Sequence, residues 1–238
     1  MSATAARAGR RGATGPTRTE RSEETRAALL RSASRTMCEL GMHGASIDRI
    51  AAAAGYTKGA FYAHFASKED LFLTMLDEHF AIELARLDAV LSGTGDPAEE
   101  ARSAAEDFLE HIDADPEWRR LYQEFATHAA RNEAFRAEFA ARQRNLRERM
   151  AAVFTRWAAD FGVTPPVPPQ DVAAMTFFMA DGFLLDQLID PELDPALYGR
   201  MFEVFMLGLM AMAEGENSPA RMPSRGDLPG IDTVATRA

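Results

Sequence analysis

The side chains best suited to hold a phosphate group are clustered between Thr57 and His64. Lys58 supplies a positive charge, while Tyr62 and His64 supply rings that can reach backbone phosphates or thymine methyl groups. Thr57 is a typical N-cap of a short helix, and the unpaired N–H groups at a helix N-terminus attract anions. The chemistry that this segment predicts is non-covalent binding of a nucleic acid.

Residues 46–65 are expected to form the two short helices that present these side chains. Ser46 is the predicted N-cap of the first helix and Gly55 is its end, and the second helix runs from Lys58 to Phe65. Helices this short are unstable alone and must be held by their neighbours. We expect the apolar residues on their inner faces to be core: Ile47, Ile50, Phe61 and Phe65.

The rest of the chain is also expected to be helical, because no segment alternates strictly between apolar and polar residues. A helix from Glu23 to Leu40, ended by Gly41, precedes the short pair, and Ser67 begins a long helix that continues to Leu91. Further helices are expected at residues 98–113, 116–130, 133–161, 170–189 and 195–214. The predicted fold class is all-α, with about nine helices.

The stretch from Ser46 to Leu71 resembles the TetR family of transcriptional regulators. The matching residues keep that family's spacing: Ile50, Ala51, Ala54, Gly55, Thr57, Gly59, Phe61, Tyr62, His64, Phe65, Lys68 and Leu71. Upstream, the positions that fit the family's first helix are Leu29, Leu30, Ala33, Met37 and Gly41.

This resemblance implies an N-terminal three-helix DNA-binding domain with a helix-turn-helix at residues 22–67, followed by a larger helical ligand-binding and dimerisation domain at residues 68–213. It also implies which residues contact DNA: Ser46, Thr57, Lys58, Gly59, Tyr62, His64 and Lys68.

The short second helix of the pair carries no Arg or Asn that would read guanine or adenine directly. Sequence specificity is therefore expected to depend on close backbone approach at Gly59, on Tyr62, or on the Arg-rich segment 1–21 entering a minor groove. A segment 1–21 that is only solvated is an equally good interpretation.

The distribution of charge supports a basic DNA-binding end on an acidic body. Residues 1–68 hold 11 Lys and Arg against 5 Asp and Glu, a net charge of +6. Without residues 1–21 this stretch holds 6 against 4, so an Arg-rich disordered tail accounts for part of the excess. Residues 69–238 hold 15 against 31, a net charge of −16, and the total is −10. Phosphates should attract the first part and repel the second, which would orient the molecule on DNA.

The two C-terminal helices predict a homodimer. Both are apolar on every face, and a helix of that kind must be buried all round. Because helices at the end of a chain can bury only one face on their own domain, a four-helix interface between two subunits is favoured over a central helix pair in a monomer. The predicted interface residues are Met175, Met179, Gly182, Phe183, Phe202, Phe205, Gly208 and Leu209.

A small-molecule pocket is expected between the fourth to eighth helices, since ligand sites in bundles lie between helices. The candidate lining residues are Phe108, His111, Trp118, Tyr122, Phe125, His128 and Phe178, although each aromatic side chain could equally be plain core. An acid such as Glu124 or Asp181 inside the pocket would favour a cationic ligand. If both acids are solvated or paired, a neutral or acyl ligand fits better.

Catalysis is not predicted. The five His residues show no HExxH pattern and no paired metal-ligand spacing, and Asp77 and His79 point to different faces of a helix. The chain also lacks a Gly-rich phosphate loop and a nucleophile elbow. We therefore expect no enzyme activity, no cofactor and no metal. A helical adaptor without DNA binding would explain the apolar helices but not the basic helix-turn-helix.

Composition predicts a cytoplasmic protein. The single Cys38 fits a reducing compartment, and we expect neither a secretory signal nor a membrane-spanning helix. Residues 1–21 and 214–238 are expected to be disordered tails. The function predicted from the residues and the resemblance is a repressor that binds a palindromic operator as a homodimer and is released by a small-molecule inducer, with activation as the alternative.

Overall fold

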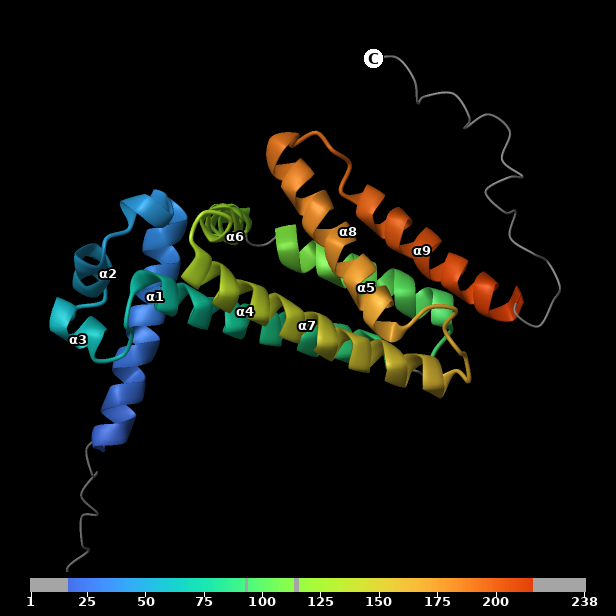
Figure 1. Cartoon of the computed structure of the whole chain (residues 1–238), viewed down its shortest axis with the longest axis horizontal. Coiled ribbons are helices and arrows are strands. Elements are labelled where there is room, and N and C mark those ends of the chain that lie inside the picture. Colours follow the sequence, from blue (N-terminus) through green and yellow to red (C-terminus); the bar gives the residue numbers. More distant parts are fainter. Residues whose placement is uncertain (1–16, 93, 114–115, 216–238) are drawn as a thin grey trace, which may run out of the picture.

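The computed structural model describes residues 17–92, 94–113 and 116–215, and within these ranges the chain forms helices and no strand (Figure 1). This confirms the predicted all-α class. The helices are α1 (Arg18–Gly44), α2 (Ile47–Ala53), α3 (Lys58–Tyr62), α4 (Lys68–Val90), α5 (Pro97–Asp113), α6 (Pro116–Ala129), α7 (Glu133–Asp160), α8 (Pro169–Ile189) and α9 (Ala196–Gly215).

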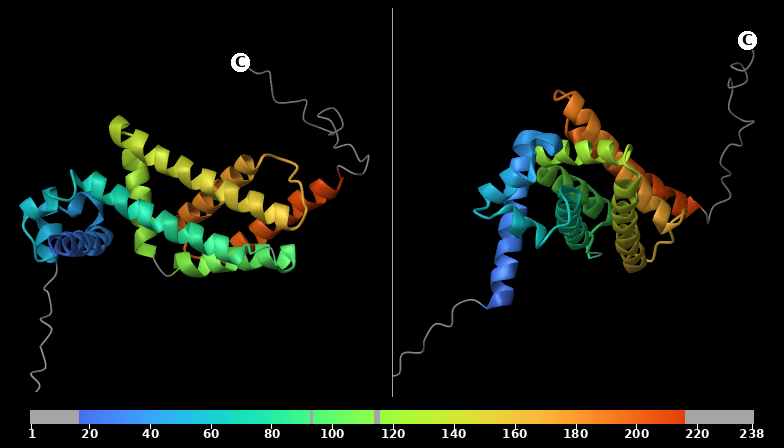
Figure 2. Two further views of the ribbon diagram at one scale, coloured as in Figure 1. Left: turned by 90° about the horizontal axis from the view of Figure 1, so that it is seen from below. Right: turned by 60° about the vertical axis from the view of Figure 1, so that its left-hand side comes forward.

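The molecule is elongated, with a head formed by α1, α2 and α3 at one end (Figures 1 and 2). Helix α4 leaves this head and runs alongside α7, while α8 and α9 lie toward the opposite end. The main packing partners are α7 with α8, α5 with α9, α1 with α6, and α4 with α7. Because α6 packs on α1, it joins the head to the rest of the molecule.

Short-range capping sets the helix starts around the head, as the sequence predicts. Ser46 Oγ accepts a hydrogen bond from the N–H of Arg49 at 3.3 Å, and Thr57 Oγ1 accepts one from the N–H of Ala60 at 3.2 Å. Ser67 begins α4 in the same way. Each bond satisfies one of the N–H groups that a helix start leaves open.

Several local predictions need correction. Helix α1 starts at Arg18 and not at Glu23, because Thr17 and Glu20 form a capping box that adds a turn to its start. The predicted tail 1–21 is therefore helical at residues 18–21, and residues 1–16 lie outside the described ranges. Helix α3 ends at Tyr62 and not at Phe65. Gly41, with φ 71° and ψ 173°, is not the left-handed cap that would end the helix; it kinks α1, and a further turn to Gly44 follows it.

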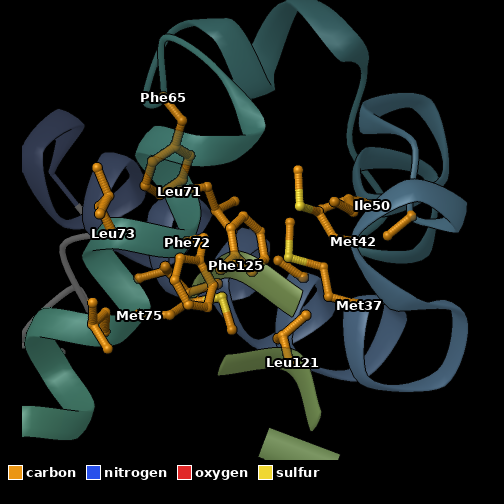
Figure 3. Packing of buried hydrophobic residues seen from close by; sticks show 14 of the residues in the cluster. Met37, Met42, Ile50, Phe65, Leu71, Phe72, Leu73, Met75, Leu121 and Phe125 are labelled. Carbon is orange, nitrogen blue, oxygen red and sulfur yellow. The ribbon is translucent and has the colours of Figure 1, made fainter. Parts of the chain in front are cut away.

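One hydrophobic core unites the head with α4, α6 and the start of α7 (Figure 3). Leu121 and Phe125 of α6 are fully buried there, and the ring of Phe125 stacks on Phe72 of α4 with centroids 3.5 Å apart. A second core joins the far half of α4 to α5, α7, α8 and α9. Since α4 takes part in both cores, a change in one can reach the other through it.

Candidate nucleic-acid interface and effector cavity

Helix α3 and its N-cap have an exposed polar face and a buried aromatic face. Thr57, Lys58 and Gly59 are exposed, and the Tyr62 side chain is 51% exposed. Beneath them, Phe61 and Phe65 are buried in the core, as predicted, and their rings pack 5.6 Å apart. The burial of these two rings fixes the direction of α3, so that its polar face points outward.

Gly59 leaves the backbone of α3 open. A Cβ atom there would meet only Thr57 Oγ1, at 3.7 Å, which is an ordinary contact distance. Packing within the chain therefore does not require glycine at this position. The absence of a side chain at Gly59 would let an external partner approach the α3 backbone closely, as the sequence predicts.

Lys58 is already paired in this structure. Its Nζ lies 3.0 Å from Asp48 Oδ2, and this hydrogen bond raises the pKa of Lys58 above its ordinary value. A phosphate that binds Lys58 would have to compete with Asp48. Arg49, an exposed cation of α2 that the sequence analysis missed, donates to the Gly44 carbonyl at 3.3 Å and lies beside the same surface.

The remaining predicted DNA contacts differ in how far they are exposed to solvent. Ser46 is exposed at the start of α2, and His64 is half-buried against Phe65, with ring centroids 6.4 Å apart. Lys68 is half-buried, and its ammonium group donates to the backbone carbonyl of Met42. Lys68 therefore ties the start of α4 to the end of α1, a structural role that the sequence analysis did not foresee.

A cavity of about 150 Å³ lies between α4, α5, α6, α7, α8 and α9. Three of the predicted residues line it, namely Phe108, Trp118 and Tyr122. The wall also includes aromatic and aliphatic side chains that sequence analysis did not single out: Phe80, Leu84, Leu87, Leu146, Met150, Phe177, Tyr198 and Phe202. The site is therefore an apolar cavity with several rings, which is typical of small-molecule sites.

Three predicted lining residues lie elsewhere. Phe125 is fully buried in the first core, His128 lies 3.6 Å from Glu69 at the far end of α6, and Phe178 is 60% exposed on the outside of α8. The prediction is wrong for these three, because helical spacing does not show which neighbour a face meets. His111 belongs to α5, but its side chain lies outside the described part of the structure.

The charged groups on the cavity wall were missed, except for Asp181. Arg86 forms a two-bond pair with Asp107, at 3.0 and 2.8 Å. Burial raises the pKa of Glu83 to about 7 and also raises the pKa of Asp181. A signal for Glu83 was present in the sequence, since it interrupts the apolar stripe of Phe80, Leu84 and Leu87 on one helix face.

Glu124 is not a cavity residue. It lies on the other side of α6, where its carboxylate accepts a hydrogen bond from the N–H of Met42 at 2.5 Å. The same carboxylate lies so near Gly41 that a Cβ atom there would approach it within 2.9 Å. Glu124 and Lys68 thus hold the last turn of α1 from both sides, and they connect it to α6 and α4.

The outer faces of α8 and α9 are apolar and exposed. Large apolar side chains gather there: Met175, Phe178, Leu185, Ile189, Met201, Val204, Leu207 and Met212. Helix α8 and residues Ala196–Ala213 are long and apolar enough to cross a membrane by length and composition alone, a test that core helices of soluble proteins also pass. Only about a fifth of each segment is buried, at 22% and 17%.

The predicted interface residues divide between this outer face and the interior. Met175, Gly182 and Gly208 are exposed, and Met179, Phe205 and Leu209 are half-buried. Phe183 and Phe202 need correction, because both are buried in the second core, with ring centroids 5.5 and 6.3 Å from that of Tyr198. A helix that is apolar all round does not reveal which side meets its own subunit.

A helix-turn-helix head joined to a helical body with an apolar cavity defines the class of DNA-binding transcriptional regulators. Comparison with known families narrows this class. Residues 29–75 match the model of the bacterial regulatory proteins of the tetR family, and residues 84–209 match the C-terminal domain of BetI-type transcriptional repressors. The chain belongs to the TetR family.

Individual relatives agree with this assignment. The transcriptional activator FasR of Mycolicibacterium smegmatis is 35% identical over 42% of this chain, which spans only 45% of FasR. The transcriptional repressor AcnR of Corynebacterium glutamicum is 29% identical over 67% of this chain and 80% of AcnR. The solved structure of FadR from Bacillus subtilis, in complex with stearoyl-CoA, covers 76% of this chain and 96% of FadR at a TM-score of 0.62 and 15% identity, which shows a common fold.

Proposed function

We propose that the chain is a ligand-responsive transcriptional repressor, which binds a palindromic operator as a homodimer and is released by a small-molecule inducer. The observation that carries this proposal is the position of α4. It starts directly after the exposed α3 surface, and its far half lines the cavity with Phe80, Leu84 and Leu87. A ligand in the cavity therefore contacts the helix on which the DNA-binding surface is mounted.

DNA binding is assigned to the exposed face of α3 and to the start of α2. Tyr62, Lys58 and the open backbone at Gly59 would approach the major groove, with Arg49 and Ser46 beside them. Lys68 donates one of its three N–H groups to Met42, which leaves the other two and its charge for a phosphate beside the start of α4.

A homodimer is supported by the exposed apolar face of α8 and α9. Val204 and Ile189 are 71% and 73% exposed, and Cβ atoms at Gly182 or Gly208 would meet nothing within 4 Å. Exposed apolar surface of this extent marks an interaction site. Pairing two copies through it would set two α3 helices on one duplex, about 34–36 Å or a multiple of this apart. We assign these helices to the dimer and the protein to the cytoplasm, not to a membrane.

Release would occur by a shift between two populations of the dimer. The ligand must bind the state that does not bind DNA more tightly, and the coupling is then reciprocal. Helix α6 offers a second connection, since Trp118 and Tyr122 line the cavity while Glu124 on the same helix holds Met42. Movement of α4 or α6 would change the spacing or tilt of the two α3 helices.

Activation is the alternative within the class, and the similarity to the activator FasR favours it. The structure of FadR with stearoyl-CoA makes an acyl compound the alternative ligand class. Both alternatives keep the same DNA-binding surface and the same cavity.

The proposal is tested by selecting duplexes from a random pool with the purified chain, then sequencing them. We expect a palindrome whose half-sites are related by the dimer, and a reporter placed under that operator should be silenced by the chain. Enrichment of no sequence would contradict operator binding and would favour an adaptor. A reporter that is switched on would establish the activator instead.

A further inference from the structure

Two polar groups on α8 stand out in the cavity wall. Thr176 is only 5% exposed, and among the described residues its Oγ1 atom has no hydrogen-bond partner. Asp181, a little more than one turn further along α8, lines the same cavity and is half-buried. A buried hydroxyl without a partner is costly, so its presence in a cavity points to a ligand that supplies the missing bond.

Asp181 lacks a cationic partner within the described part of the chain. It accepts a hydrogen bond from Gln123, an uncharged amide. The two arginines on the wall are engaged elsewhere, because Arg86 is paired with Asp107 and Arg119 donates to Gln187. Burial raises the pKa of Asp181, so a cation placed beside it would stabilise the carboxylate.

The walls around Asp181 are rich in aromatic rings. Tyr122, Trp118 and Phe177 line the cavity, and the Tyr122 hydroxyl accepts a hydrogen bond from Gln143 at 2.8 Å, which leaves its own O–H group free to donate. Ring faces attract organic cations, most strongly where water is excluded.

We propose that the cavity takes an apolar organic cation, an amine or quaternary ammonium compound whose charged nitrogen pairs with Asp181 and whose apolar body lies among the rings. Thr176 adds a hydrogen bond to a polar atom of the ligand. A carboxylate ligand is disfavoured, because Asp181 would face it with like charge. This inference rests on the proposed function, since it names the ligand class of the same cavity.

Calorimetric titration of the full chain with three eight-carbon probes tests the ligand class: octyltrimethylammonium, octanoate and octanol. We expect the cation to bind at least about tenfold more tightly than octanoate. Asp181→Asn should lower the affinity for octyltrimethylammonium at least about tenfold and change the affinity for octanol little. Thr176→Val should lower the affinity for octanol, whose hydroxyl can bond to Thr176, by less than about tenfold, and leave the affinity for octyltrimethylammonium, which has no hydrogen-bonding atom, unchanged.

Asp186→Asn is the matched control, because Asp186 lies on the same helix but is exposed and does not line the cavity. It should leave all three affinities unchanged. Tighter binding of octanoate than of the cation, equal effects of D181N and D186N, or no binding of the cation at millimolar concentration would overturn the inference. Thermal unfolding of both variants, which should resemble that of the native chain, excludes simple misfolding.

Operator binding measured with the same probes separates this inference from the proposed function. If octanoate releases the operator and the cation does not, the chain remains a ligand-responsive repressor while the cation assignment fails. If no duplex is bound at all, the proposed function fails, although the calorimetric result on the cavity still stands by itself.

Discussion

At the scale of single residues, burial decides which polar groups can act on a partner. Tyr62 is 51% exposed on α3, whereas Lys68 is half-buried and one of its N–H groups is bonded to a backbone carbonyl. Both residues are implied as DNA contacts by the same family resemblance. The difference between them arises from the turn after Gly41, which brings the Met42 carbonyl to Lys68 and which no local sequence pattern reveals.

Tyr62→Ala tests the contact surface. Because this side chain is 51% exposed, its removal should leave the fold intact while lowering operator affinity by at least about tenfold. Fluorescence anisotropy with a labelled operator measures the effect. Ile82→Ala is the control, since Ile82 is 52% exposed on α4. An equal loss in both variants would remove Tyr62 from the interface.

Glu83 predicts a pH dependence of stability. Its folded-state pKa is raised from 4.5 to about 7, so the stability linked to its protonation is complete below pH 4.5 and is lost as the pH rises through 7. The loss is on the order of 3 kcal/mol. Glu83→Gln, which resembles the neutral form, should therefore be more stable than the native chain at pH 8 and nearly equal to it at pH 4.5.

Urea unfolding of Glu83→Gln at both pH values, at one protein concentration, checks this prediction. Glu148→Gln is the control, because Glu148 is exposed on α7. A difference between E83Q and the native chain that is the same at both pH values would show that Glu83 titrates normally in the folded protein.

At the scale of elements, the junction between α1, α4 and α6 is the part of the fold that sequence reasoning missed. The caps at Ser46, Thr57 and Ser67 were predictable, because each bond spans three residues. The bond between Met42 and Glu124 spans 82 residues and could not be predicted from spacing. The interior positions of Phe183 and Phe202 were missed for a related reason, since α8 and α9 have no polar face to orient them.

Gly41→Ala tests this junction. Gly41 has a φ of 71°, and an added Cβ would lie 2.9 Å from the Glu124 carboxylate. The variant should lose about 1–3 kcal/mol of unfolding free energy, because this combination with ψ 173° is adopted almost only by glycine. Gly199→Ala is the matched control, because its Cβ meets nothing within 4 Å in α9, and it should gain roughly 0.5–1 kcal/mol. Chemical denaturation measures both, and a neutral Gly41→Ala would mean that the α1 turn can relax.

At the scale of the whole molecule, the head and an acidic body are joined by α4 and α6, which reach from the head to the cavity. The charge asymmetry and the apolar C-terminal helices were visible in the sequence, because they are sums over many residues. Asp181 was a candidate from the sequence as well, whereas Glu83 was not singled out, because its significance depends on burial among six helices.

Val204→Asp tests the proposed dimer, which would place two α3 helices on one duplex. Val204 is 71% exposed on α9, and a charge there should separate the proposed subunits without disturbing either core. Sedimentation should show a monomer, and operator affinity should fall by at least about tenfold, because each head would then bind alone. Ile82→Asp should change neither. A V204D chain that remains dimeric would place the interface elsewhere.

The measurement that tests the central claim most directly is binding of the native chain to its selected duplex across a salt titration. We expect a dimer whose log affinity falls with log salt at a slope of about −4 or steeper, since each phosphate contact contributes roughly −0.9 and two heads contact the backbone. Absence of binding at low ionic strength, or an affinity indifferent to salt, would contradict the role of α3 as a DNA-binding surface.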